Sequence, residues 1–325
     1  MKNRAIAGVI LALLLLTAAG IIALLPGRSE EKHVVSFPVM GTVASLTFYT
    51  DEGTFEKSVR EIKKEFDKVS AIANRHVPES EISRLNKEAH KAPFVCSAEL
   101  WEILTESRLA CRLSEGAFDI SVSPLMVHWG FYRKRAQLPS PGETAKVKAL
   151  TGLEKVIFND SKRTVKFPAQ GFALDLGGIA KGYAIELACR KAIECGISRG
   201  IIDLGGNLRL LPLPPPGNKF YKIGIRRPDR KNGGVMPEVL KLPGNLAVSS
   251  SGDYERFITI EGKRLGHIMD PETGVPAPGN RAVTAISDRG MRSDWLSTAV
   301  YLKGKKLADK LEENLEHTRF VIIER

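Results

Sequence analysis

Helical and strand patterns follow one another irregularly along this 325-residue chain, and that order constrains the fold more than any other feature. A doubly wound parallel sheet needs a regular succession of strands and helices. Here residues 34–49 alternate apolar and polar side chains as a half-buried strand does, and residues 54–73 carry apolar side chains three and four apart as an amphipathic helix does. Several strand patterns then follow one another between residues 200 and 260. The sequence therefore predicts a mixed α+β fold with mostly antiparallel sheets and packed helices.

Caps, turns and apolar runs mark the other expected elements. Ser97 is a suitable N-cap for a second helix, and Gly196 is a suitable C-cap for a third. The expected helices cover 97–114, 179–195, 293–302 and 305–314. A hairpin is expected over 153–167, and strands over 200–203, 208–211, 221–225, 246–250, 256–260 and 320–323.

The N-terminal segment, residues 1–28, has a pattern of its own. Lys2 and Arg4 precede an uncharged stretch over residues 5–25, which as a helix is long enough to cross a hydrocarbon core of about 30 Å. Basic residues ahead of such a span favour a cytoplasmic N-terminus and export of the rest of the chain. We therefore expect a transmembrane helix at the plasma (inner) membrane, followed by an exported domain over residues 29–325. A cleaved signal peptide is the alternative.

The formal net charge of +11 does not predict nucleic-acid binding, because the Lys and Arg residues are spread along the chain with no run of five. The same charge would attract a phosphorylated cofactor. The four cysteines match neither a CxxC metal site nor a dense disulfide framework, so we expect small buried thiols, with a disulfide as the alternative. They are Cys96, Cys111, Cys189 and Cys195.

Three segments rich in glycine or serine could approach a phosphorylated ligand. Residues 174–183 place an acid, a glycine pair and a lysine at the start of an expected helix, where backbone amides attract phosphate, although the order is not that of a P-loop. Residues 203–207 repeat a glycine pair and could equally form a simple hairpin. The hydroxyls of residues 249–251, next to a predicted turn, could donate to phosphate or bond their own backbone.

Two further motifs carry groups suited to proton transfer and to a metal ion. His267 stands three residues before Asp270 and a Pro and Gly turn, so the histidine could accept a proton while the acid orients it. A surface turn capped by Asp270 is the alternative. Asp294 and Thr298 stand four apart on an expected helix, so their oxygens face the same way. This pair suits Mg²⁺ better than zinc, because no His or Cys accompanies it.

Each of these motifs is weak alone, but eight occur together in one order. They cover residues 40–42, 80–86, 116–119, 174–183, 202–207, 250–254, 267–274 and 293–298. In this combination the chain resembles the FAD:protein FMN transferases, the ApbE family, over roughly residues 34–325.

The resemblance implies a site that takes FAD as substrate and Mg²⁺ as cofactor. It implies that Lys181 and His267 are the catalytic residues, with Lys181 holding phosphate and His267 accepting the proton of the acceptor. It implies a metal held between the Gly178 carbonyl, Asp294 and Thr298. The implied FAD-binding residues are Met40, Ala117, Phe118, Asp119, Asp175, Lys181, Ser251 and His267.

The resemblance also implies a reaction, the transfer of FMN from FAD to a threonine hydroxyl with release of AMP. The acceptor would be an exported or membrane flavoprotein that carries a Ser/Asp-Gly-Ala-Thr type motif. An FAD pyrophosphatase and a non-catalytic exported FAD-binding protein stay open as alternatives. Two positions depart from the family pattern: His76 stands where members often carry an aromatic residue, and Ser293 where the metal motif often begins with Ala.

Overall fold

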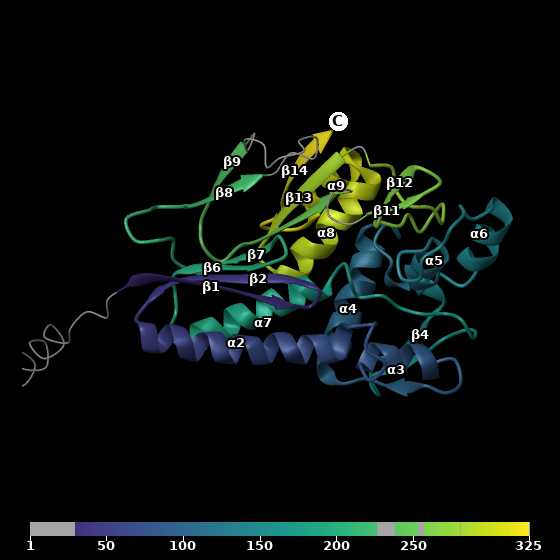
Figure 1. Cartoon of the computed structure of the whole chain (residues 1–325), viewed down its shortest axis with the longest axis horizontal. Helices are drawn as coiled ribbons and strands as arrows, with labels where there is room; N and C mark the ends of the chain where they lie inside the picture. The colour runs from purple at the N-terminus through teal and green to yellow at the C-terminus, as the bar shows by residue number, and fades with distance from the viewer. Residues whose placement is uncertain (1–29, 226–237, 253–256, 280, 325) are drawn as a thin grey trace, which may run out of the picture.

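The computed structural model of the protein describes residues 30–225, 238–252, 257–279 and 281–324 (Figure 1). Within these ranges no helix is both long enough and apolar enough to cross a membrane. The expected transmembrane segment, residues 1–28, lies outside the described residues, so it stays a prediction.

A seven-stranded sheet forms the centre of the fold, with the strand order β1-β2-β6-β7-β10-β13-β14. Neighbouring strands in this sheet pair in the antiparallel sense. The predicted α+β class with mostly antiparallel pairing is therefore confirmed. The strands are β1 (Glu31–Val39), β2 (Thr42–Thr50), β6 (Gly200–Leu204), β7 (Asn207–Leu210), β10 (Ala247–Gly252), β13 (Arg281–Ser287) and β14 (Arg319–Glu324).

The single strand expected over residues 34–49 is wrong, because the chain reverses at Met40 and Gly41. Both residues have positive φ, 50° and 69°, and Val39 pairs with Thr42 across them. Positive φ at both central residues is the geometry of the tight hairpin turns that match the twist of the strands. Because apolar and polar side chains alternate in both strands of the hairpin, the pattern gave no sign of the turn between them.

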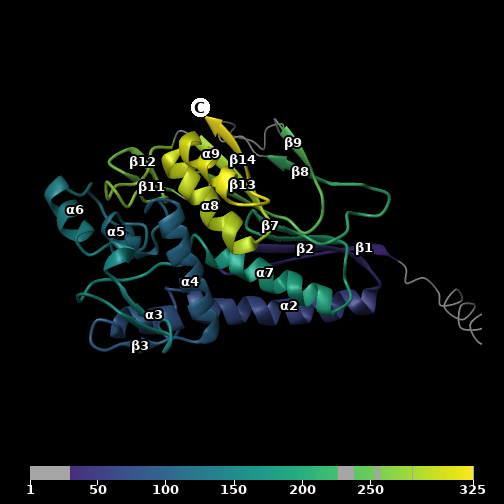
Figure 2. The ribbon, with the colours of Figure 1, turned by 180° about the vertical axis from the view of Figure 1, so that it is seen from behind.

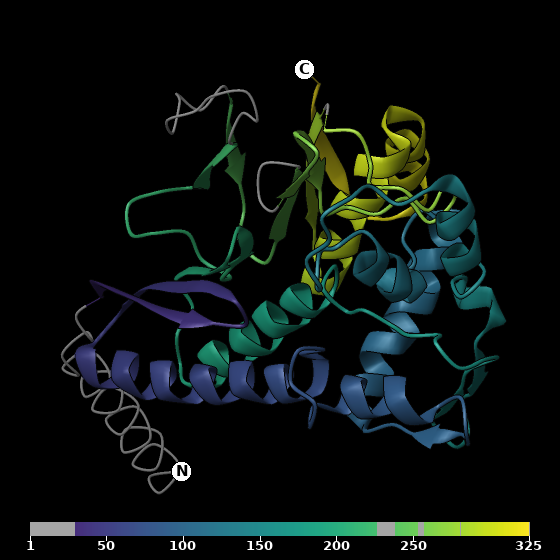
Figure 3. The ribbon, with the colours of Figure 1, turned by 45° about the vertical axis from the view of Figure 1, so that its right-hand side comes forward.

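Three helices cover one face of this sheet: α2 (Glu52–Ala73), α7 (Ala180–Glu194) and α8 (Gly290–Lys303). Figure 2 shows α7 between α2 and α8, and Figure 3 shows the β1–β2 hairpin above α2. Helix α2 begins where the Asp51 carboxylate accepts a hydrogen bond from the Thr54 amide at 2.9 Å. Ile62, Phe66 and Val69 in its apolar stripe are fully buried, and the stripe packs against the sheet and α7.

A second group of elements packs beside the end of α2 and closes one side of the molecule (Figure 1). It holds a three-stranded sheet of order β3-β5-β4, which contains the expected hairpin, and a two-stranded sheet. Its elements are α3 (Glu81–Glu88), β3 (Phe94–Val95), α4 (Ala98–Leu113), α5 (Ser123–His128), α6 (Pro141–Lys148), β4 (Ile157–Asn159), β5 (Thr164–Lys166), β11 (Phe257–Ile260) and β12 (Lys263–Gly266). Helix α9 (Lys305–Asn314) and the pair β8 (Tyr221–Ile225) and β9 (Glu238–Leu242) complete the described α-helices and β-strands.

All four cysteines are free thiols, as expected. Cys96 and Cys189 are buried, whereas Cys111 and Cys195 are partly exposed. Burial raises the pKa of the Cys96 and Cys111 thiols to about 12, which keeps them protonated and unreactive at neutral pH.

Candidate active site

One cavity of about 550 Å³ lies where the hairpin turn, the start of α7 and the first turns of α8 meet. It gathers residues from segments that are far apart in the sequence. The structure brings every site residue predicted from the sequence to its lining: Met40, Ala117, Phe118, Asp119, Asp175, Gly178, Lys181, Ser251, His267, Asp294 and Thr298.

The charged centre of the cavity forms where α7 and α8 touch. The buried Asp294 carboxylate accepts a hydrogen bond from the Gly182 amide at 2.8 Å through Oδ2. Its other oxygen, Oδ1, lies 3.6 Å from the Lys181 ammonium, which is an ion pair beyond hydrogen-bonding distance. The helix contact thus fixes the carboxylate and leaves one oxygen available to a further positive charge.

This contact depends on two glycines. A Cβ atom on Gly182 would lie 2.3 Å from the carbonyl oxygen of Gly290, and a Cβ on Gly290 would lie 2.3 Å from the carbonyl oxygen of Gly182. Any larger residue would push the two helices apart, and Lys181 would then move away from Asp294.

Gly182→Ala should therefore lower the free energy of unfolding by roughly 2–3 kcal/mol, because the added methyl meets backbone and forces the two helices apart. Denaturant unfolding of a protein comprising residues 29–325 measures the change. The matched control is Gly142→Ala in α6, where an added Cβ meets nothing within 4 Å and should be neutral or slightly stabilising. Equal stability of the two variants would contradict the close helix contact.

The serine-rich segment, residues 249–251, lies within a strand, which extends two residues beyond the end expected at residue 250. Strand β10 continues to Gly252, so alternate hydroxyls face α8. Ser251 Oγ lies 2.8 Å from Ser297 Oγ and 3.3 Å from Thr298 Oγ1. Ser251 therefore orients the hydroxyl of Thr298. The end of the motif, residues 253–254, lies outside the described residues.

The second glycine pair forms the β6–β7 hairpin, as the simpler interpretation held. Asp203 Oδ1 accepts a hydrogen bond from the Gly206 amide at 2.9 Å, and Gly205 and Gly206 both have positive φ. A Cβ on Gly205 would lie 2.4 Å from Thr42 Oγ1, so this turn packs directly against the β1–β2 hairpin. Gly205 nevertheless lines the cavity.

The turn at residues 116–119 supplies an apolar wall. Phe118 packs on Trp295 with ring centroids 6.3 Å apart, and its Cε2 lies 3.0 Å from where a Cβ on Gly178 would be. Asp119 is buried, which raises the pKa of its carboxyl, and it accepts hydrogen bonds from the backbone amides of Ser121 and Leu153. Its carboxylate therefore holds the turn in shape.

A partly buried charge network behind this wall was missed by the sequence reasoning. Glu106 on α4 accepts hydrogen bonds from the Trp295 indole at 3.1 Å and from Arg289 at 3.2 Å. Arg289 also lies 3.6 Å from Glu186 on α7. The network ties three helices together around the start of α8 and so positions Asp294. No local motif signals it, because its members meet only in the folded chain.

His267 lines the cavity, while Asp270 belongs to the turn that follows. The Asp270 carboxylate accepts hydrogen bonds from the Glu272 amide and the Thr273 hydroxyl, each at 2.9 Å. Asp270 therefore caps the turn, which is the alternative role considered for it in the sequence analysis. His128 lies outside the cavity lining, where its ring nitrogen Nε2 is 3.2 Å from Thr144 Oγ1.

The oxygen donors near Asp294 fit a hard cation. No group of three or more His, Cys, Asp and Glu side chains in the described ranges could hold a metal. The predicted set is of another kind, with one carboxylate, one hydroxyl and one main-chain carbonyl. Thr298 Oγ1 lies 3.8 Å from where a Cβ on Gly178 would be, and Asp294 stands one helical turn before Thr298 on α8. Such oxygen ligands suit Mg²⁺, which keeps several waters and often shares substrate phosphates.

The sequence match decides the family, because the model of the ApbE family covers residues 40–322. The chain belongs to the ApbE family. This confirms the family predicted from the eight motifs, and with it the prediction of an enzyme.

Relatives of known function and structure support the same conclusion. The FAD:protein FMN transferase of Haemophilus influenzae is 29% identical over 322 residues, which cover 94% of this chain and 92% of that protein. The FAD:protein FMN transferase of Vibrio cholerae is 29% identical over 284 residues, covering 86% and 83%. The solved ApbE protein of Thermotoga maritima superimposes with a TM-score of 0.82 at 27% identity, covering 90% of this chain and 94% of its own. The flavin transferase ApbE from Vibrio cholerae gives 0.78 at 26%, covering 90% and 97%.

Proposed function

We propose that this ApbE-family protein transfers FMN from FAD to a threonine hydroxyl of an acceptor protein, with Mg²⁺ as cofactor and AMP as the leaving group. The observation that carries the proposal is the junction of α7 and α8, which places Lys181, Asp294 and Thr298 in one cavity with His267. Its relatives named FAD:protein FMN transferases support the substrate.

In this reaction the threonine oxygen forms a bond to the phosphorus on the FMN side of the pyrophosphate, and the bond from that phosphorus to the AMP oxygen breaks. His267 takes the threonine proton, and Lys181 holds the phosphate. Asp294, Thr298 and the Gly178 carbonyl would hold Mg²⁺, which when bound neutralises charge on the phosphate oxygens. AMP leaves with the electrons of the broken bond.

Incubation of the purified exported domain with FAD, Mg²⁺ and a peptide of the Ser/Asp-Gly-Ala-Thr type tests the proposal. A peptide heavier by the mass of a phosphoester-linked FMN, with one AMP released per peptide modified, is the expected result. Free FMN and AMP with unmodified peptide would support an FAD pyrophosphatase instead. Bound FAD that stays intact would support a binding protein.

We also propose that residues 1–28 anchor the protein in the plasma (inner) membrane, with its catalytic domain on the extracytoplasmic side. The support is Lys2 and Arg4 ahead of the apolar stretch over residues 5–25. The natural acceptors are then exported or membrane flavoproteins. Co-expression with such proteins, followed by a search for covalent flavin fluorescence in a denaturing gel, would identify them.

The membrane-extracted protein should accordingly begin near Met1, because an uncleaved anchor keeps its basic N-terminus in the cytoplasm. Intact-mass measurement or N-terminal sequencing of the full chain checks this. A mature chain that begins near Gly20 would show a cleaved signal peptide.

A further inference from the structure

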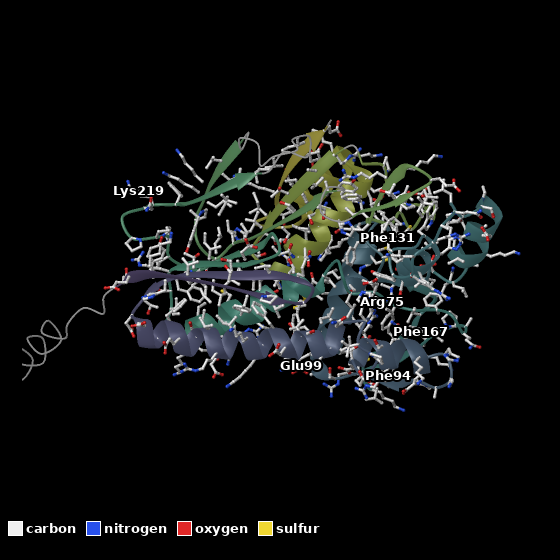
Figure 4. All side chains as sticks on the ribbon, in the orientation of Figure 1. Arg75, Phe94, Glu99, Phe131, Phe167 and Lys219 are labelled. Atoms are coloured by element: carbon white, nitrogen blue, oxygen red, sulfur yellow. The ribbon has the colours of Figure 1, made fainter. Side chains whose placement is uncertain are left out.

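One wall of the cavity carries polar and aromatic side chains for which the proposed chemistry has no use. Arg75, labelled in Figure 4, and His76 follow the end of α2, and Tyr132 follows α5. All three line the cavity together with Asp175. Of these four residues, only Asp175 lies within the eight segments that resemble the family.

The ring of Tyr132 is held on three sides. Its hydroxyl donates a hydrogen bond to Asp175 Oδ2, and the guanidinium carbon of Arg75 lies 4.0 Å from the ring centroid. The ring of His76 lies 5.1 Å away at an angle of 74°. Burial, and then the neighbouring Asp175 charge, raise the pKa of the Tyr132 hydroxyl, so it remains a protonated donor. The ring is therefore fixed before any ligand arrives.

Both oxygens of Asp175 already accept hydrogen bonds, because Oδ1 accepts from the Gly177 amide at 2.9 Å and Oδ2 from Tyr132. Arg75 Nη1 is different. It is buried and lies 3.7 Å from Asp175 Oδ2, yet it makes no hydrogen bond to any described residue. A buried guanidinium N–H without an acceptor is costly, so an acceptor atom of a ligand would complete it.

This wall suits one of the two ring systems of FAD better than the other. The isoalloxazine carries two ring carbonyls on one edge, which accept from a guanidinium that can only donate. Adenine has no carbonyl, and the acceptors it can offer Arg75 are ring nitrogens with one lone pair each, whereas each flavin carbonyl oxygen has two. Lys181 and Asp294 mark the part of the cavity that suits the phosphates.

We propose that Tyr132 is a ring-positioning residue that contacts the isoalloxazine of bound FAD, and that Arg75 donates a hydrogen bond to one of the ring carbonyls. The inference rests on the proposed use of FAD. It assigns the ring contact to Tyr132 and Arg75, next to His76, which stands where members of the family often carry an aromatic residue.

Flavin fluorescence tests the contact without any acceptor or turnover. A phenol in contact with an excited isoalloxazine quenches it by electron transfer, and a phenylalanine ring does not. Tyr132→Phe should therefore raise the fluorescence of FAD bound to the exported domain several-fold over the wild type. The matched control is Tyr183→Phe, which also removes a phenol bonded to a carboxylate, that of Glu102 at 3.1 Å, but lies outside the cavity lining and should change nothing. Unchanged fluorescence in Tyr132→Phe would overturn the proposal.

Titrations with FMN and with AMP identify which ring of FAD contacts this wall. Because two different variants are titrated, the result does not depend on the folding of either one alone. Arg75→Gln and Tyr132→Ala should each weaken FMN binding by about ten-fold and leave AMP binding unchanged. Weaker AMP binding with unchanged FMN binding would place adenine at this wall and overturn the assignment. If FMN binding follows the proposal while no acceptor is ever modified, only the proposed transfer is contradicted.

Discussion

Asp294→Asn should lower the rate of FMN transfer by at least about a thousand-fold while the protein stays folded, because it removes the carboxylate charge proposed to hold Mg²⁺. The amide oxygen of asparagine can still accept the hydrogen bond that the Gly182 amide donates to Asp294 at 2.8 Å. Asp294→Ala should lose activity too, but it also leaves that buried amide without a partner. Two quantities are measured on both variants, the transfer rate with an acceptor peptide and the midpoint of thermal unfolding. Together they distinguish loss of the carboxylate charge from loss of the folded structure.

The wild-type protein supplies the control for this prediction. Excess EDTA should stop transfer, and added Mg²⁺ should restore it, while Asp294→Asn should not recover at any Mg²⁺ concentration that still saturates the wild type. Full activity in EDTA would remove the metal from the mechanism. Loss of activity in Asp294→Ala but not in Asp294→Asn would show that Asp294 only joins the two helices.

The elements that the sequence predicted well are those whose signals are local. Helix α9 has the expected bounds, and α2 begins two residues earlier than expected, at Glu52, where Asp51 caps it. Helix α8 begins at Gly290, three residues before the expected start. A glycine followed by mixed residues indicates a turn when read alone. What extends the helix there is packing against Gly182, more than a hundred residues away.

The pairing of strands could not be predicted from the sequence. Strand β2 pairs with β6 in the antiparallel sense, Leu46 opposite Ile202, although some 150 residues separate them. Periodicity indicates which face of a strand is buried, but it says nothing of which strand lies beside it. The reversal at Met40 shows the same limit, because alternation of period two continues through a two-residue turn.

The site residues divide in the same way. The positions that belong to compact motifs, such as Asp294, Thr298 and His267, were predicted, and the structure brings them to one cavity. Tyr132 and Glu106 were missed, because their meaning comes from partners distant in the sequence, Asp175 for the first and Trp295 for the second. A phenol in a loop or a glutamate in a helix carries no signal until those partners are known.

His267→Ala should lower the rate of FMN transfer by roughly a hundred-fold or more, the usual size of a general-base contribution, while affinity for FAD barely changes. His267 lines the same cavity as Lys181, the residue proposed to hold the phosphate. The matched control is His128→Ala, which also removes an imidazole but acts on a residue outside the cavity lining, bonded to Thr144 at 3.2 Å. Its transfer rate should stay close to that of the wild type.

Two measurements on each variant decide the role of His267, because a base and a binding residue fail differently. A base acts on the proton of the acceptor, so its loss lowers the rate at saturating FAD and leaves the FAD titration curve in place. A residue that contacts the cofactor or supports the turn at residues 270–274 weakens FAD binding or folding in step with the rate. Near-normal transfer by His267→Ala, or FAD affinity that falls as far as the rate, would therefore remove His267 from the role of base, and the proton of the threonine would then have to leave to water or to the phosphate itself.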